Sequence, residues 1–154
     1  MGRETVDDFL QMSFQAQIES VAEDLTTQHW DEEARVICNS FGAYLFLHAQ
    51  TLMPPYMGKV LLLSPIVGHF TDTENSKTGF YPPRASQLLQ IAATGTYPTP
   101  KQAEIHVGER DWQSNPDNVT RLGTYLGLPV TVVPNAGHML PKAYVSHLLD
   151  QWLS

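Results

Sequence analysis

The pattern of apolar and polar positions predicts four short strands. Residues 34–38 and Lys59–Leu63 are short apolar runs, rich in the residue types that fill strands buried on both faces of a sheet. Residues 102–107 and 129–133 are predicted as the third and fourth strands. We expect a small sheet built from these four runs.

The spacing of apolar residues predicts helices before, between and after the strands. Apolar residues recur along one face of a helix predicted over residues 5–28, and Thr5 with Asp8 resembles a capping box. A second helix, predicted to begin at Phe41 or Gly42, is apolar almost all round, which is typical of a helix enclosed by protein. The remaining predicted helices are residues 85–93, Pro116–Leu126 and Lys142–Leu153.

The order of these elements predicts the fold class. A strand, a helix and a second strand follow one another within residues 34–63, and so short a connection implies a parallel pair with a right-handed crossover. We therefore predict an α/β fold with a small, mostly parallel sheet of about four strands flanked by helices. We expect residues 1–154 to form one domain, in which the irregular stretch 65–100 is interpreted as a lid or substrate-binding loop.

Composition and charge narrow the classes of function. The 154 residues carry a formal net charge of −7 with scattered basic residues, which disfavours nucleic acid as a partner. No apolar run approaches the about 20 residues of a membrane helix, so no membrane span is expected. The charged N-terminal residues lack the apolar core of a secretory signal, so we expect a cytoplasmic protein. Cys38 is the single cysteine, which excludes an intrachain disulfide.

Ser40 is a candidate nucleophile at the turn between the first strand and the second helix. Small residues are expected two positions before and two after a nucleophile in so tight a turn, and Cys38 and Gly42 stand there. A serine at this position can also simply cap the following helix. The segment alone leaves both interpretations open.

Asp111 and His138 follow the third and fourth predicted strands. Each comes shortly after a glycine, at the carboxyl edge where parallel sheets place their ligands. Glu109 and Asp117 are the other candidates for the acidic residue of this site. Alternatively, both are charged loop residues exposed to solvent. His138 is one of six histidines. It is the one that both follows a glycine directly and comes after Ser40 and Asp111, which gives the order Ser, Asp, His along the sequence.

These motifs resemble the α/β-hydrolase family over residues 5–154, most closely in the stretch 122–140. The resemblance implies that Ser40 is the nucleophile, Asp111 the orienting acid and His138 the base, and that the main-chain N–H of Phe41 contributes to the oxyanion hole. It further implies a serine hydrolase that cleaves a small carboxylic ester or thioester through an acyl-enzyme. No cofactor is expected, and the histidine spacings lack a metal motif.

The sequence departs from that family before the first predicted strand. The early strands of the family, and the loop that donates the second oxyanion-hole N–H, have no counterpart in it. Residues 34–38 would then form a sheet edge, which we expect a second copy of the chain or the N-terminal segment to cover. The alternative function is a non-catalytic α/β-hydrolase-like binding module, or a remnant without a complete oxyanion hole.

An apolar acyl pocket could lie beneath the stretch 65–100. The aromatic and aliphatic residues considered for its walls could equally pack in the core of the domain. They are Phe41, Ile66, Val67, Phe70, Phe80, Tyr81 and Tyr97.

Overall fold

Four parallel strands form one sheet in the order β1-β2-β3-β4. The computed structural model describes residues 8–71 and 81–154. Residue pairing is regular along the sheet, with Ile37 beside Leu61 and Leu62 beside Ile105. The strands are β1 (Arg35–Asn39), β2 (Lys59–Leu63), β3 (Gln102–Gly108) and β4 (Val130–Val133). The predicted α/β class, with four parallel strands, is therefore confirmed.

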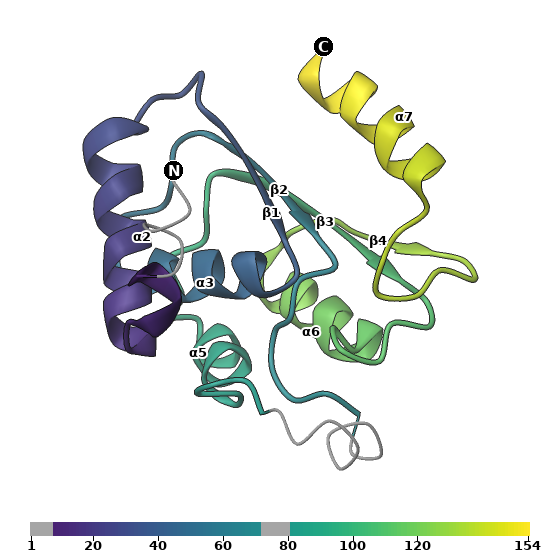
Figure 1. The fold of residues 1–154 in the computed structure, drawn as a ribbon, viewed down its shortest axis with the longest axis horizontal. Coiled ribbons are helices and arrows are strands. Elements are labelled where there is room, and N and C mark those ends of the chain that lie inside the picture. Colours follow the sequence, from purple (N-terminus) through teal and green to yellow (C-terminus); the bar gives the residue numbers. More distant parts are fainter. Residues whose placement is uncertain (1–7, 72–80) are drawn as a thin grey trace.

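Helices cover both faces of this sheet (Figure 1). Helix α7 (Lys142–Leu153) lies on one face, and the other described helices lie on the opposite face. These are α2 (Phe14–Gln28), α3 (Phe41–Ala49) with the short 3₁₀ helix η1 (Gln50–Leu52), α5 (Gln87–Thr94) and α6 (Pro116–Leu126). Within the described ranges, no helix has both the length and the apolar character needed to cross a membrane.

The two faces of the sheet have separate apolar cores. Side chains alternate along a strand, so Val60 and Leu62 enter the larger core with α3, whereas Leu61 and Leu63 face α7. Helix α3 is buried on almost every side, which explains its nearly uniform apolar sequence. On the other face, Trp152 near the end of α7 completes the smaller core.

The first predicted helix is interrupted, so the single helix expected over residues 5–28 is wrong. Helix α2 begins at Phe14 because the Ser13 hydroxyl accepts a hydrogen bond from the main-chain N–H of Ala16, at 3.1 Å. Ser13 itself is extended, and residues 8–11 form a separate helical turn before it. A serine side chain that satisfies a helix N-terminus starts a new helix at that point. Thr5 of the predicted capping box lies outside the described residues.

His48 on α3 is enclosed in the larger core. Its ring packs edge-on against Phe14 and Tyr44, and its Nε2 makes no hydrogen bond to any described residue. Burial lowers the pKa of His48 to about 4, and the positive charge of Arg84 acts in the same direction. The imidazole is therefore neutral in the folded protein at neutral pH.

This buried imidazole makes stability dependent on pH. Between about pH 6.5 and pH 4 the unfolded chain binds a proton at His48 that the folded protein does not bind, so stability falls as the pH is lowered through this window. We expect this residue to account for up to about 3 kcal/mol of the loss. Urea unfolding at pH 7 and pH 4.5 should show a smaller pH effect in His48→Phe than in wild type or in the exposed control His147→Gln. An unchanged pH effect in His48→Phe would contradict the assignment.

Candidate active site

Ser40 occupies a strained turn between β1 and α3. Its φ of 55° and ψ of −120° are rarely adopted by a residue with a side chain. The turn is fixed by its main chain, because the N–H of Ser40 donates to Leu63 and its carbonyl accepts from Tyr44 and Ile66. The hydroxyl makes no capping bond to α3. The helix-cap interpretation of Ser40 is therefore wrong.

The Ser40 hydroxyl instead contacts His138. Its Oγ lies 2.7 Å from Nε2 of that ring, although the two residues are 98 positions apart in the sequence. His138 follows β4, and its side chain is 22% exposed, so its ring is accessible from outside. Of the histidines in the described ranges, it is the one hydrogen-bonded to Ser40.

Asp111 completes a line of hydrogen bonds from Ser40 through His138. Nδ1 of His138 lies 2.9 Å from Oδ2 and 3.0 Å from Oδ1 of Asp111. The carboxylate is fully buried, and its Oδ1 also accepts from the main-chain N–H groups of Gln113 and Ser114. Neither of the other candidate acids has a hydrogen bond to His138 among the described residues. Glu109 accepts from the main-chain N–H of Asn135, and Asp117 is exposed in the first turn of α6.

Ser114 is a member of this network that the sequence analysis missed. Its hydroxyl donates to the carbonyl of Ser64 at 2.7 Å and lies 3.4 Å from Nδ1 of His138. Ser114 is 1% exposed, and it joins the turn after β3 to the turn after β2. The available signal was its position three residues after Asp111, where a turn can return an N–H to the carboxylate.

The two residues flanking the Ser40 turn differ from expectation. A Cβ added to Gly42 would meet no described atom within 4 Å, so the expected steric need for a small residue there is not observed. Cys38 is partly buried, and burial raises the pKa of its thiol to about 12. The thiol therefore stays protonated at neutral pH and is a poor competitor for Ser40 as a nucleophile.

The loops that carry Asp111 and His138 are held together by close main-chain contact. A Cβ on Gly108, at the end of β3, would overlap the carbonyl oxygens of Ala136 and Gly137. The N–H of Arg110 donates to the Ala136 carbonyl at 2.8 Å. Glycine at position 108 thus lets the loop after β4 approach closely enough for His138 to reach Asp111.

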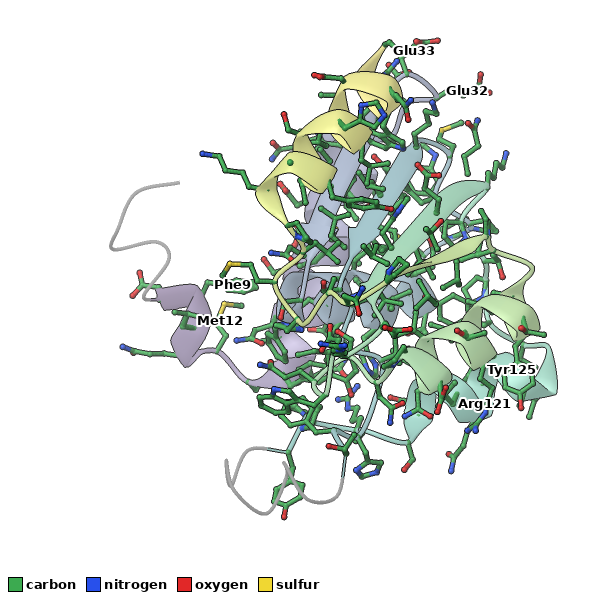
Figure 2. The ribbon with its side chains drawn as sticks, turned by 90° about the vertical axis from the view of Figure 1, so that its right-hand side faces the viewer. Phe9, Met12, Glu32, Glu33, Arg121 and Tyr125 are labelled. Carbon is green, nitrogen blue, oxygen red and sulfur yellow. The ribbon has the colours of Figure 1, made fainter. Side chains whose placement is uncertain are left out.

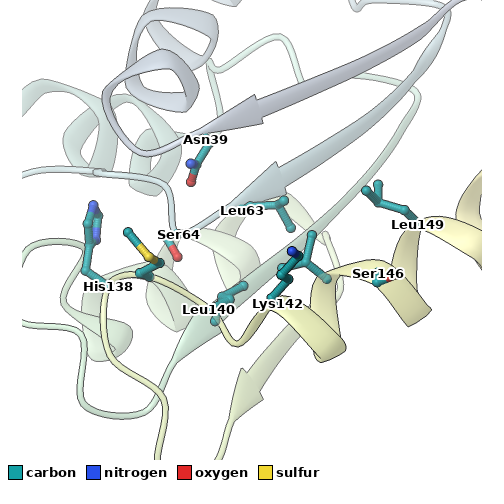
Figure 3. A pocket seen from close by; sticks show the side chains of 10 residues that line it. Asn39, Leu63, Ser64, His138, Leu140, Lys142, Ser146 and Leu149 are labelled. Carbon is teal, nitrogen blue, oxygen red and sulfur yellow. The ribbon is translucent and has the colours of Figure 1, made fainter.

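An apolar pocket of about 550 Å³ opens between the carboxyl ends of β1 and β2 and the start of α7 (Figure 3). His138 and Ser64 lie at one end of it, and Leu63, Leu140 and Leu149 form much of its wall. Lys142 and Asn39 add polar groups to the lining. This pocket lies on the α7 side of the sheet.

The residues considered for an acyl pocket do not line this one. Tyr81 is 59% exposed, Phe41 packs partly buried against the larger core, and Phe80 lies outside the described residues. The other four are buried in the larger core, as their packing interpretation expects. They are Ile66, Val67, Phe70 and Tyr97.

The comparisons with known proteins concern the fold. No protein-family model and no curated protein matches the chain. Among solved structures, a monoacylglycerol lipase of Paleococcus ferrophilus is similar, with a TM-score of 0.62 and 12% identity over 92% of this chain and 75% of that one. A mutant of the meta-cleavage product hydrolase CumD gives a TM-score of 0.63 and 14% identity over 93% and 71%.

A third similar structure is an alpha/beta hydrolase from the sediment metagenome of the Mar Chica lagoon in Morocco. Its TM-score is 0.57, with 16% identity over 94% of this chain and 71% of that one. The chain has the α/β-hydrolase fold. Within this fold, Ser40, Asp111 and His138 come from the turns after β1, β3 and β4, so all three lie at the carboxyl edge of the sheet. The residues described contain no cluster of three or more histidine, cysteine or acidic side chains able to hold a metal ion.

The close approach at Gly108 can be tested with two glycine variants. We expect Gly108→Ala to lower the free energy of unfolding by about 1–3 kcal/mol, because the added methyl group forces the two loops apart. Gly42→Ala is the matched control, since its methyl group meets open space within a helix and should be neutral or slightly stabilising. Urea unfolding measures both. Equal stabilities for the two variants would contradict the proposed role of Gly108.

Proposed function

We propose that the protein is a serine hydrolase that cleaves a small carboxylic ester or thioester through an acyl-enzyme. The observation that carries this proposal is the continuous line of hydrogen bonds from Ser40 through His138 to Asp111. A serine hydroxyl becomes an effective nucleophile when a neutral imidazole removes its proton during attack. A carboxylate behind the imidazole fixes its tautomer and stabilises the imidazolium that forms.

The reaction follows from the roles of these three residues. Ser40 Oγ attacks the carbonyl carbon as Nε2 of His138 takes its proton, and the resulting imidazolium protonates the departing alkoxide or thiolate. The acyl group then remains on Ser40. Water attacks this ester while His138 accepts a proton from it, and return of that proton to Ser40 releases the carboxylic acid. Asp111 orients the imidazole and stabilises the imidazolium, and two main-chain N–H groups also donate to its carboxylate.

The developing oxyanion needs hydrogen-bond donors. Phe41 is the first residue of α3, so its main-chain N–H lies at the positive end of a helix dipole and is proposed as one donor. Loss of one donor from an oxyanion hole costs about a hundredfold to a thousandfold in rate.

The pocket beside His138 supports a substrate with an apolar portion. Its wall is formed largely by aliphatic side chains, and it opens next to the proton-accepting ring. Two of the similar structures are a monoacylglycerol lipase and a meta-cleavage product hydrolase, which supports a hydrolytic reaction on a small molecule. No metal or cofactor takes part in the proposed reaction.

The second candidate is a non-catalytic binding module. The apolar pocket beside His138 is compatible with it, because such a pocket can hold a ligand without reacting with it. The two functions differ in whether Ser40 is an activated nucleophile, and a covalent probe can distinguish them without knowledge of the substrate.

Labelling by a fluorophosphonate probe tests the nucleophile directly. We expect the wild-type protein to gain one probe adduct in its intact mass, and we expect Ser40→Ala to gain none. Ser146→Ala is the matched control, because this exposed serine lines the same pocket and should leave labelling unchanged. Folded wild-type protein that does not react would favour the binding module. A Ser40→Ala variant that still reacts would contradict the assignment of Ser40 as the nucleophile.

The role of Asp111 is tested by removing its charge at constant shape. In Asp111→Asn we expect probe labelling to slow by about a thousandfold to ten-thousandfold, because the imidazole loses the partner that fixes its tautomer. Asp117→Asn, an exposed acid six residues along the chain, is the control and should label at the wild-type rate. Near-normal labelling of folded Asp111→Asn would remove this residue from the mechanism.

A further inference from the structure

Strand β1 is an edge of the sheet, and its main-chain groups show which residues face outward. The carbonyl of Ala34 accepts from Lys59 at 2.9 Å, and the N–H of Ser40 donates to Leu63 at 3.0 Å, so both residues point toward β2. Successive residues of a strand direct their main-chain groups to opposite sides. The N–H and C=O groups of Arg35, Ile37 and Asn39 are therefore directed to the outer side, where no described strand pairs with them.

The side chains of β1 leave this edge unprotected. Ile37 is 45% exposed on the α7 face, and the strand contains neither proline nor lysine. The charged group of Arg35 is directed toward α7. Its guanidinium donates to the Trp152 carbonyl at 3.0 Å and lies 6.0 Å from the centre of the indole ring. Natural sheet edges usually carry charges, prolines or bulges that prevent further pairing.

The opposite edge of the sheet provides a contrast. Strand β4 has four residues, and Pro129 and Pro134 stand immediately before and after it. Proline cannot donate a main-chain hydrogen bond, so these residues limit the length of any strand that could pair there. Of the two edges, β1 is the one suited to a new partner.

We propose that the β1 edge pairs with the β1 edge of a second copy of this chain. Antiparallel pairing centred on Ile37 places the outward main-chain groups of Ile37 opposite those of the partner subunit's Ile37. Arg35 then lies opposite Asn39 of the partner subunit, and Asn39 opposite the partner's Arg35. Each outward N–H thus meets an outward C=O, no arginine faces an arginine, and the two half-exposed isoleucine side chains meet on one face of a continuous sheet.

Charge also favours the antiparallel arrangement. The loop before β1 carries Asp31, Glu32 and Glu33, all exposed, and Figure 2 shows Glu32 and Glu33 at that end of the molecule. Lys142 lies at the other end of β1, where it lines the pocket together with Asn39. An antiparallel pair brings the acidic end of each subunit toward the Lys142 end of the other. A parallel pair would instead set the acidic loops side by side.

Sedimentation and light scattering test the proposal without reference to catalysis. Between about 1 and about 100 μM we expect a monomer–dimer equilibrium that weakens at high salt. Ile37→Lys should raise the dissociation constant at least about tenfold, because it sets two charges against each other at the centre of the interface. Val132→Lys is the matched control, since Val132 is similarly exposed, at 40%, on the opposite edge strand. It should leave the dimer intact.

A cross-link tests the register. In a Cys38→Ser background, we expect Ile37→Cys to form an intermolecular disulfide readily, because opposed residues of an antiparallel pair lie within disulfide range. Val132→Cys in the same background should remain largely uncross-linked. Three results would overturn the proposal. The first is a protein that stays monomeric at every concentration. The second is a dimer that Val132→Lys abolishes and Ile37→Lys does not. The third is a monomer in which the Ile37 amide is protected from hydrogen exchange, which would mean that the chain covers its own edge.

Discussion

The carboxylate of Asp111 is enclosed by protein, and an enclosed negative charge is strongly destabilising unless hydrogen bonds and a counter-group replace the lost water. Three donors meet this requirement, two from the following main chain and one from His138. The main-chain carbonyl of Asp111 also accepts from Asn115, whose side chain caps α6. The burial of one charge therefore couples the end of β3, the start of α6 and the loop after β4.

The parallel sheet makes this coupling possible. Because every strand ends at the same edge, residues 40, 111 and 138 meet there although they are far apart in the sequence. The strained backbone at Ser40 has a similar origin. Its N–H and carbonyl are held by β2 and by the segment after it, so the turn keeps an unfavourable φ that directs the hydroxyl toward His138.

Residue patterns predicted the sheet and much of the residue cluster at its edge. The bounds of β2, α6 and α7, and the start of α3, follow from apolar runs and from strong breakers such as Gly127. Ser13 was missed because a single side-chain hydrogen bond decides where α2 begins, and the apolar spacing continues across it. Ser114 and the pocket were missed for another reason. They depend on distant segments that meet, as where Ser114 bonds to Ser64 and where Asn39 and Lys142 line one pocket, and such meetings leave no periodic signal.

Helix α7 extends along β1 and β2, from their carboxyl ends to their amino ends. Near its end, the ring centre of Trp152 lies 6.0 Å from the guanidinium of Arg35 and 5.8 Å from the ammonium of Lys59, at the amino ends of β1 and β2. Its first residue, Lys142, lines the pocket beside His138 at the carboxyl ends of the same strands. Because α7 is one continuous helix, the packing of Trp152 in its last turn and the position of Lys142 in its first turn are set together. The amino ends of β1 and β2 therefore help to position one wall of the pocket beside the imidazole.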